Sequence, residues 1–464
     1  MLFAASAWLI SSCTLMVKSE TRSNCINDNW QFFRVDSIVT PSDSVQYAQG
    51  KFSESENVKL PHTPRLEPEV VNDQWQGICY YGKDITLTTN DLQQHLFLRF
   101  DAAMNEATIY INGKIAKQHL GGYLPIILKI NDFVHEGENK IVVCLDNNDN
   151  ATTGPKPLKR LDFNTYGGIY RSAWLEKFNA VHITDANFEA SGEAGIQFRT
   201  IAIDGNVALN EVNTNVKNES AEDVVVTVLS ALVPAQGKSA VQLSSTDTIK
   251  ANQSVTYKQN LDLKYPKLWS PNSPNLYSLQ TSVFVNGRLV DFRETKVGIR
   301  TIEISVNALK INGKETFLRG VNRHQEYPYI GYALSDEAQW RDARLIKEAG
   351  FDYVRCSHYP PSPAFLDACD NLGILVLDAI LGWQYFGDEK FEAQSLSDSH
   401  QLLRRDRNHA CILAWELSIN ESWMPSSFTS KVAAIRDEEA PAHGLQPVPP
   451  RILQLERIPG RECP

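Results

Sequence analysis

The sequence has few of the features that mark metal-binding, nucleic-acid-binding or membrane-spanning proteins. Its formal net charge is -10. It therefore lacks the basic excess that a phosphate backbone attracts, and we expect no nucleic-acid partner. None of its cysteines forms a Cys-x-x-Cys pair, so we predict neither a zinc site nor a disulfide framework. The eight cysteines are scattered, at Cys13, Cys25, Cys79, Cys144, Cys356, Cys369, Cys411 and Cys463.

Long hydrophobic runs are absent as well. The uncharged segment 1–12 is too short to span a bilayer as a helix. It resembles the apolar core of a signal peptide without a basic start. The tetrapeptide at 10–13, Ile-Ser-Ser-Cys, resembles a bacterial lipobox in which Cys13 would be lipidated. The segment 1–27 therefore predicts an exported protein, either periplasmic or anchored on the bacterial envelope as a lipoprotein. The alternative is an apolar N-terminus that frays and has no sorting role.

The composition is that of an ordinary soluble globular protein. The chain has 464 residues, of which 42% are hydrophobic and 22% are charged. This length predicts about three domains of usual size.

The first 300 residues read as two β-sandwiches. Within 28–178, the alternating segment His95 to Phe100 predicts a strand, and Asn112-Gly113 predicts a hairpin inside Thr108 to Ile115. Tyr166 to Arg171 closes this unit, and its paired glycines predict a positive φ or a close backbone approach. We interpret the unit as a jelly roll. It serves as a scaffold or, alternatively, contacts carbohydrate.

The second unit, 179–299, has the size and strand spacing of an immunoglobulin-like sandwich. Its clearest strands are Val224 to Leu229 and Tyr277 to Val285, and Asn286-Gly287 turns the second of these back on itself.

After residue 300 the hydrophobic period changes, and strands alternate with helices up to residue 439. This alternation predicts right-handed βαβ units and a parallel sheet, which would form the first half of a (β/α)8 TIM barrel. The predicted strands lie at 316–321, 351–356, 374–377 and 411–417, and the predicted helices at 335–350, 363–372 and 396–407.

A polar residue follows each of these four strands. These residues are His324, His358, Asp378 and Glu421. The carboxyl ends of barrel strands share one face, where catalysis takes place, so four such residues in succession favour a functional face. The alternative is that each is an ordinary loop residue or a hydrogen-bonded core histidine.

Two stretches carry a resemblance to a known family. The segment from Arg355 to Pro360, with the helix and strand after it, and the segment from Asp406 to Glu421 resemble the two signatures of glycoside hydrolase family 2. Tyr166 to Arg171 and Phe317 to His324 are also typical of that family, which includes β-galactosidases, β-glucuronidases and β-mannosidases. The resemblance covers roughly residues 28 to 439. Three residues depart from the signatures: Asp352, where asparagine is usual, Ala414 and Glu416.

The resemblance implies retaining hydrolysis of β-linked glycosides. Glu421 matches the catalytic acid/base, and Asn420 matches the residue that hydrogen-bonds the sugar 2-hydroxyl. Arg355 matches the arginine that orients the nucleophile, and His324 and His358 match substrate-contacting histidines. The expected partner is an oligosaccharide or glycoside substrate. A second copy of the same chain, in a homo-oligomer, is a further partner that we consider.

Two departures from the best-known β-galactosidases bear on the site. The residues after Asp378 are Ala-Ile-Leu-Gly-Trp, without the glutamate that helps to hold magnesium. We therefore expect no metal and no cofactor. Trp423 stands where a glycine is common, which would narrow the pocket.

The resemblance also places the nucleophile on the seventh barrel strand, which we expect this chain to lack. A full barrel needs about 250 residues, whereas the segment 440–464 is rich in proline and without periodicity. We predict that this tail is disordered or frameshifted and that the truncated chain has little activity. The alternatives are a carbohydrate-binding pseudoenzyme and a non-functional fragment with an open, exposed half barrel.

Overall fold

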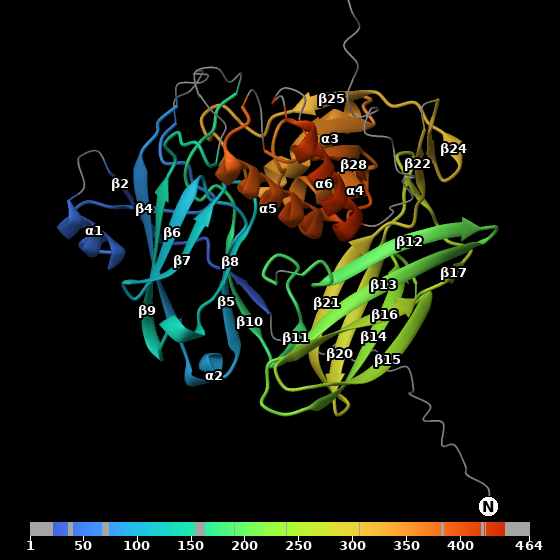
Figure 1. The fold of residues 1–464 in the computed structure, drawn as a ribbon, viewed down its shortest axis with the longest axis horizontal. Coiled ribbons are helices and arrows are strands. Elements are labelled where there is room, and N and C mark those ends of the chain that lie inside the picture. The colour runs from blue at the N-terminus through green and yellow to red at the C-terminus, as the bar shows by residue number, and fades with distance from the viewer. Residues whose placement is uncertain are drawn as a thin grey trace, which may run out of the picture.

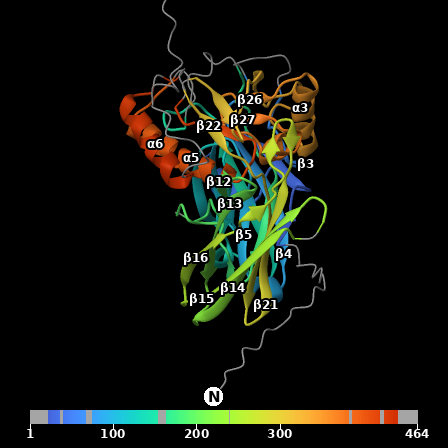
Figure 2. The same cartoon turned by 90° about the vertical axis from the view of Figure 1, so that its right-hand side faces the viewer.

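The computed structural model describes residues 22–35, 40–66, 74–153, 163–189, 191–237, 239–305, 307–381, 385–418, 422 and 424–440. The predicted tail from residue 441 onward and most of the predicted export segment therefore lie outside the described residues. A jelly roll, an immunoglobulin-like sandwich and a parallel sheet follow one another along the chain (Figure 1). In both views the parallel strands and their helices lie at one end of the molecule, beside both sandwiches (Figure 2).

The first domain is a sandwich of two antiparallel sheets. One has the order β1-β10-β5-β8 and the other the order β3-β2-β4-β9-β6-β7. Apolar side chains from both sheets, among them Trp30, Phe100 and Ile109, fill the space between them at 0% exposure. The strands are β1 Ser23–Cys25, β2 Trp30–Arg34, β3 Glu56–Val58, β4 Ile78–Leu87, β5 His95–Phe100, β6 Glu106–Ile111, β7 Lys114–Leu120, β8 Ile126–Lys129, β9 Gly137–Asp146 and β10 Ala173–Phe178.

Local sequence signals in this domain are confirmed. The strand His95–Phe100 forms as predicted. Asn112 and Gly113 form the predicted hairpin turn between β6 and β7, with φ angles of 51° and 77°. Gly168 has φ 99°, and a Cβ there would lie 2.5 Å from a backbone carbonyl oxygen, which confirms the close approach.

Two features of the first domain differ from the sequence prediction. Strand β1 lies within 1–27, so the sandwich begins by Ser23 and not at residue 28. Short helices also interrupt the strands, and the first is capped by Thr40 in a capping box with Asp43. These helices are α1 Pro41–Ala48, α2 Thr89–Leu92 and the 3-10 turn η1 Asn131–Phe133.

The second domain packs one sheet, β11-β13-β12 with β16 and β17 on β13, against another, β15-β14-β20-β21. Their facing side chains form a core that includes Val212, Val228 and Leu279. Tyr277–Val285 matches the predicted strand. The strands are β11 Val181–Ile183, β12 Ile196–Asp204, β13 Val207–Asn218, β14 Val224–Pro234, β15 Val241–Ile249, β16 Gln253–Asn260, β17 Leu263–Lys264, β18 Trp269–Ser270, β19 Ser273–Pro274, β20 Tyr277–Val285 and β21 Arg288–Val297.

A small three-stranded sheet leads into the third domain. It consists of β22 Ile302–Ile304, β23 Leu309–Ile311 and β24 Lys314–Glu315. The predicted strand at 316–321 is wrong, because the first parallel strand is β25 Gly320–Arg323. Phe317 is 82% exposed and lies outside any strand, although its apolar character favoured a buried strand.

The third domain confirms the predicted parallel order. β25, β26 Tyr353–Cys356, β27 Leu375–Ala379 and β28 Ile412–Glu416 pair in sequence, all parallel. Within the described residues, β25 and β28 each pair with one neighbour in this sheet. The helices are α3 Asp336–Glu348, α4 Pro363–Leu372, α5 Glu389–Asp406 and α6 Ser426–Glu439.

Helix boundaries follow from capping residues. The Ser335 hydroxyl accepts the Ala338 N–H at the start of α3, and Gly373 ends α4 with φ 70°. Helix α5 begins at Glu389 rather than at residue 396, because the Asp388 carboxylate caps it by accepting two backbone N–H groups. The apolar faces of all four helices pack on one side of the parallel sheet. Among the helices of the described ranges, none is long and apolar enough to cross a membrane.

Candidate functional site

Two of the predicted site residues, His324 and His358, lie together at the carboxyl ends of adjacent strands. β25 and β26 pair with Asn322 opposite Arg355, so the residues that follow the two strands emerge side by side. The imidazole ring centroids of His324 and His358 are 6.1 Å apart. The hydroxyl of Tyr359 is 3.4 Å from Nδ1 of His324. The structure thus places both predicted histidines at one site.

The jelly roll supplies one wall of this site. The ring of Phe163 lies 4.6 Å from that of His324 and 6.3 Å from that of His358, measured between centroids. Five tyrosines, all buried, surround this wall and span the boundary between the jelly roll and the parallel sheet. They are Tyr123, Tyr166, Tyr170, Tyr332 and Tyr359. Because aromatic wall residues come from distant parts of the chain, sequence spacing gave no sign of Phe163 or Tyr123.

A further carboxylic acid beside the histidines was not singled out in the sequence. Glu326 lies two residues after His324, and Asn164 of the jelly roll hydrogen-bonds to its carboxylate. Burial raises the pKa of Glu326 above its ordinary value, although these hydrogen bonds act in the opposite direction. Its position three residues after the end of β25 was the signal that could have identified it.

Arg355 lies on the sheet face opposite the helices, paired across the strands with Asn322 and Leu377. Its guanidinium forms a two-pronged ion pair with Glu416, with Nε 2.8 Å from Oε2 and Nη2 2.6 Å from Oε1. The two side chains are 16% and 13% exposed. In the sequence, Glu416 stood out only as a departure from the family signature. In the structure its carboxylate pairs with Arg355, the arginine predicted to orient the nucleophile.

Asp378 does not belong to the functional face, which corrects the sequence prediction. It lies inside β27 and alternates with Leu377, so it points to the helix-covered side of the sheet and is 0% exposed. Burial raises its pKa well above the ordinary value, and the nearby Asp406 carboxylate raises it further. We therefore interpret Asp378 as a buried structural acid whose neutral form is favoured by burial.

The predicted catalytic pair, Glu421 and Asn420, lies outside the described residues, as does Trp423. The described strand that leads to the pair, β28, ends at Glu416. Ser422, which follows Glu421, is 1% exposed.

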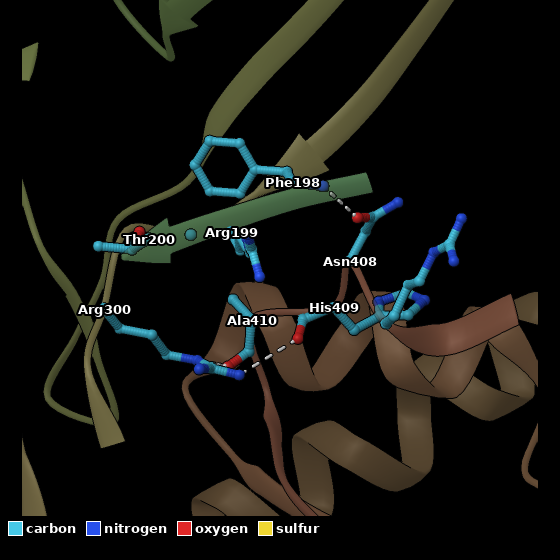
Figure 3. A pocket seen from close by; sticks show the side chains of 9 residues that line it. Phe198, Arg199, Thr200, Arg300, Asn408, His409 and Ala410 are labelled. Carbon is cyan, nitrogen blue, oxygen red and sulfur yellow. Dashed lines mark hydrogen bonds between the residues drawn. The ribbon is translucent and has the colours of Figure 1, made fainter. Parts of the chain in front are cut away.

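The first part of the second signature joins the parallel sheet to the immunoglobulin-like domain (Figure 3). The side-chain oxygen of Asn408 accepts the Phe198 N–H at 2.9 Å, and Arg300 donates to the carbonyl oxygen of Ile412 at 2.7 Å. The cavity between them measures about 20 Å³, room for about one water molecule. A larger hollow of about 370 Å³ lies between the immunoglobulin-like domain and α6, and none of the predicted site residues lines it.

His409 in this signature forms an ion pair with Asp370. His409 Nδ1 is 2.7 Å from Asp370 Oδ2, and the Cys411 N–H donates to Asp370 Oδ1 at 2.6 Å. Although burial alone lowers the pKa of His409, the charge of Asp370 and the hydrogen bond to it raise that pKa to about 9.

Asp370, His409 and Cys411 also place three potential metal-ligand atoms within 4.8 Å of one another. The hydrogen bonds above already occupy both carboxylate oxygens, and burial raises the pKa of the Cys411 thiol, which disfavours the thiolate a metal needs. We interpret this cluster as structural.

Two β-sandwiches precede a parallel strand–helix sheet, and polar and aromatic side chains gather beyond its strand ends, which is the layout of a multidomain protein with a partial (β/α)8 barrel. Sequence models of glycosyl hydrolases family 2 match the chain in three consecutive parts. These are the sugar binding domain at 18–178, the model that carries the family name alone at 194–300 and the TIM barrel domain at 302–440. The chain belongs to glycosyl hydrolase family 2.

Individual relatives agree with this assignment. A β-galactosidase of Thermoanaerobacter pseudethanolicus is 31% identical over 89% of this chain and 55% of its own length. A β-glucuronidase of Bacteroides fragilis is 26% identical over 92% of this chain and 61% of its own. The crystal structure of a Bacteroides uniformis β-glucuronidase superposes with a TM-score of 0.79 at 27% identity, over 90% of this chain and 51% of that one. The chain spans about half the length of the curated relatives it matches.

These comparisons confirm the predicted fold class: jelly roll, immunoglobulin-like sandwich and partial TIM barrel.

Proposed function

We propose that the chain carries the acid/base part of an active site that hydrolyses β-linked glycosides with retention of configuration. The observation that carries this proposal is the pairing of His324 and His358 beyond adjacent parallel strands, walled by Phe163, in a chain of this family. Imidazole nitrogens and an aromatic face together suit a sugar, because a sugar offers hydroxyl groups at its edge and apolar C–H groups on its faces.

In this proposal Glu421 protonates the leaving oxygen and later removes a proton from water. Asn420 donates a hydrogen bond to the sugar 2-hydroxyl, and the two histidines contact the substrate. A retaining reaction also needs a nucleophilic carboxylate about 5 Å from the acid/base. Arg355, held by Glu416, lies on the sheet face that such a carboxylate would share.

We further propose that the 464-residue polypeptide alone has little hydrolytic activity. The described residues contain four parallel barrel strands, whereas the barrel that carries this chemistry has eight. Binding does not need the nucleophile, so a glycoside can still be recognised by the histidines and the jelly-roll wall.

The test compares binding and hydrolysis in the same preparations. Aryl β-galactosides and aryl β-glucuronides are the substrates to use, because the relatives carry these names. We expect micromolar to millimolar binding and little hydrolysis by the chain itself. Adding the remainder of a full-length relative's barrel in one polypeptide should restore hydrolysis that Glu421→Gln abolishes. Glu438→Gln, an exposed acid on α6, is the matched control.

Each outcome is informative. Hydrolysis by the 464-residue chain at the rate of a full-length relative would refute the proposed low activity. Binding that Glu421→Gln does not change, with no hydrolysis in the completed barrel, would favour the carbohydrate-binding pseudoenzyme. No binding and no cooperative melting would favour the non-functional fragment.

Export is a separate proposal that rests on residues 1–27 alone. If Cys13 is lipidated, labelled palmitate should be incorporated into the wild-type protein in bacteria and not into Cys13→Ala. Labelling of neither protein would refute the lipoprotein anchor.

A further inference from the structure

One arginine of the jelly roll contacts both histidine-bearing loops. Arg171 is 5% exposed. Its Nη2 donates to the carbonyl oxygen of Pro360 at 3.0 Å and to Oε1 of Gln325 at 3.3 Å, and its Nη1 donates to the carbonyl oxygen of Tyr123 at 2.9 Å. Gln325 directly follows His324, and Pro360 lies two residues after His358. The same guanidinium thus touches the loop after β25 and the loop after β26.

A second set of contacts connects these two loops to each other. The Gln325 N–H donates to the Tyr359 hydroxyl oxygen at 3.0 Å, and that hydroxyl lies 3.4 Å from His324 Nδ1. The Tyr359 ring stacks on Tyr123, with centroids 4.7 Å apart and planes inclined by 6°. Since Tyr123 belongs to the jelly roll and also accepts a hydrogen bond from Arg171, the loops are attached to that domain at two points.

The planar guanidinium of Arg171 can bond to both loops only when they hold one position relative to each other. Burial lowers the pKa of Arg171, so the charged form is retained only at a cost that its hydrogen bonds offset. A guanidinium presents its N–H groups in a fixed planar fork. Movement of either loop would leave a buried donor without its acceptor, and this couples the positions of the two loops.

We infer that Arg171 is a positioning residue: from the jelly roll it fixes the two loops that carry His324 and His358. The inference deepens the proposed function and rests on it for the meaning of the site. It makes the jelly roll part of the active site's construction, rather than only a scaffold or a separate sugar-binding module.

The experiment is hydrogen exchange followed by mass spectrometry on the whole chain, with wild type, Arg171→Lys and a control. Lysine keeps the charge but lacks the fork. The control is Arg22→Lys, because Arg22 is a part-buried arginine that joins Asp291 and Ile183 in a contact between the jelly roll and the immunoglobulin-like sandwich, away from the histidine loops. We expect Arg171→Lys to speed exchange about tenfold in peptides covering 322–334 and 356–362, as loss of one or two hydrogen bonds predicts. Arg22→Lys should leave those peptides unchanged.

Unchanged exchange in both loops of Arg171→Lys, or an equal increase in Arg22→Lys, would overturn the inference. If Arg171→Lys does not fold, Gln325→Ala removes one acceptor of the same Nη2 group, and exchange near Pro360 should still rise. No rise there would count against the inference.

Exchange does not depend on catalysis, so it separates this inference from the proposed function. If wild type binds neither an aryl β-galactoside nor an aryl β-glucuronide, the proposed function fails while the exchange result still decides the role of Arg171. If wild type binds one of them, Arg171→Lys should weaken that binding and Arg22→Lys should not.

Discussion

Replacing His409 by glutamine should remove a pH-dependent part of this protein's stability. The imidazole is 17% exposed, and its partner Asp370 is 1% exposed. The pKa of His409 is raised to about 9, against an ordinary value of 6.5. At 1.36 kcal/mol for each pKa unit, this difference corresponds to a stabilisation of about 3 kcal/mol. Because the folded-state pKa is the higher one, the stabilisation is fully present below pH 6.5 and is lost as the pH rises through 9.

The assay is denaturant unfolding followed by tryptophan fluorescence at pH values from about 6 to about 9.5. Trp269 is a local reporter, because its indole N–H donates to the Asp370 carbonyl oxygen at 2.8 Å and it is 0% exposed. The difference between wild type and His409→Gln should be about 3 kcal/mol near pH 6 and should shrink as the pH approaches 9. Groups that titrate in both proteins cancel in this difference.

A double variant, Asp370→Asn with His409→Gln, removes the buried carboxylate that the single substitution leaves unpaired. It should show the same flat pH profile as His409→Gln while recovering part of the lost stability. If wild type and His409→Gln instead kept a constant difference from about pH 6 to about pH 9.5, the charged ion pair would not exist as described.

Three further substitutions test the packing and charge of the described domains. Asp378→Asn should be neutral or stabilising at about pH 7, because burial raises the pKa of this carboxyl group. Wild type, but not the variant, should lose stability as the pH rises above the ordinary pKa of aspartate, and thermal melting at several pH values would measure this difference. Gly168→Ala, whose Cβ would lie 2.5 Å from a carbonyl oxygen, should lower the free energy of unfolding by about 2 kcal/mol or more. Gly137→Ala, at φ 93° with no atom within 4 Å of the added Cβ, should lower it by about 1 kcal/mol. Equal losses of stability in chemical denaturation would contradict the steric argument. Glu439→Ala removes a side chain that is 0% exposed, forms an ion pair with Arg404 and hydrogen-bonds to His400, both on α5. It should cost about 3 kcal/mol, while Glu438→Ala should cost almost nothing. Limited proteolysis that released α6 equally in both variants would refute the buried pairing.

Much of the local structure could be predicted from the sequence because it depends on neighbouring residues. Asn-Gly pairs at 112–113, 286–287 and 312–313 adopt the positive φ angles that tight hairpins need. Ser335 and Gly373 mark helix ends through a single side-chain hydrogen bond and a left-handed φ. The alternation of strands and helices after residue 300 likewise predicted the parallel order of the sheet.

The errors arose where burial decides the outcome. The apolar side chain of Phe317 favoured a buried strand. In the structure it is 82% exposed and precedes β25. Asp378 follows an apolar run, as a catalytic residue would, but the two-residue period of β27 turns it toward the helices. Neither side chain's environment is encoded within the few residues on either side of it.

The sequence by itself determined the family, the three-domain order and the predicted candidates Glu421, Asn420, Arg355, His324 and His358, because signatures and strand periodicity are local patterns. Only the tertiary structure decided which side chains surround Arg355, His324 and His358. Phe163 lies against the two histidines, and Arg171 contacts Gln325 and Pro360 in the loops that carry them, each from more than 150 residues away along the chain. Glu416 pairs with Arg355 across two strand pairings. Such contacts depend on how the domains pack, since burial of apolar surface and the satisfaction of buried donors are properties of the whole fold.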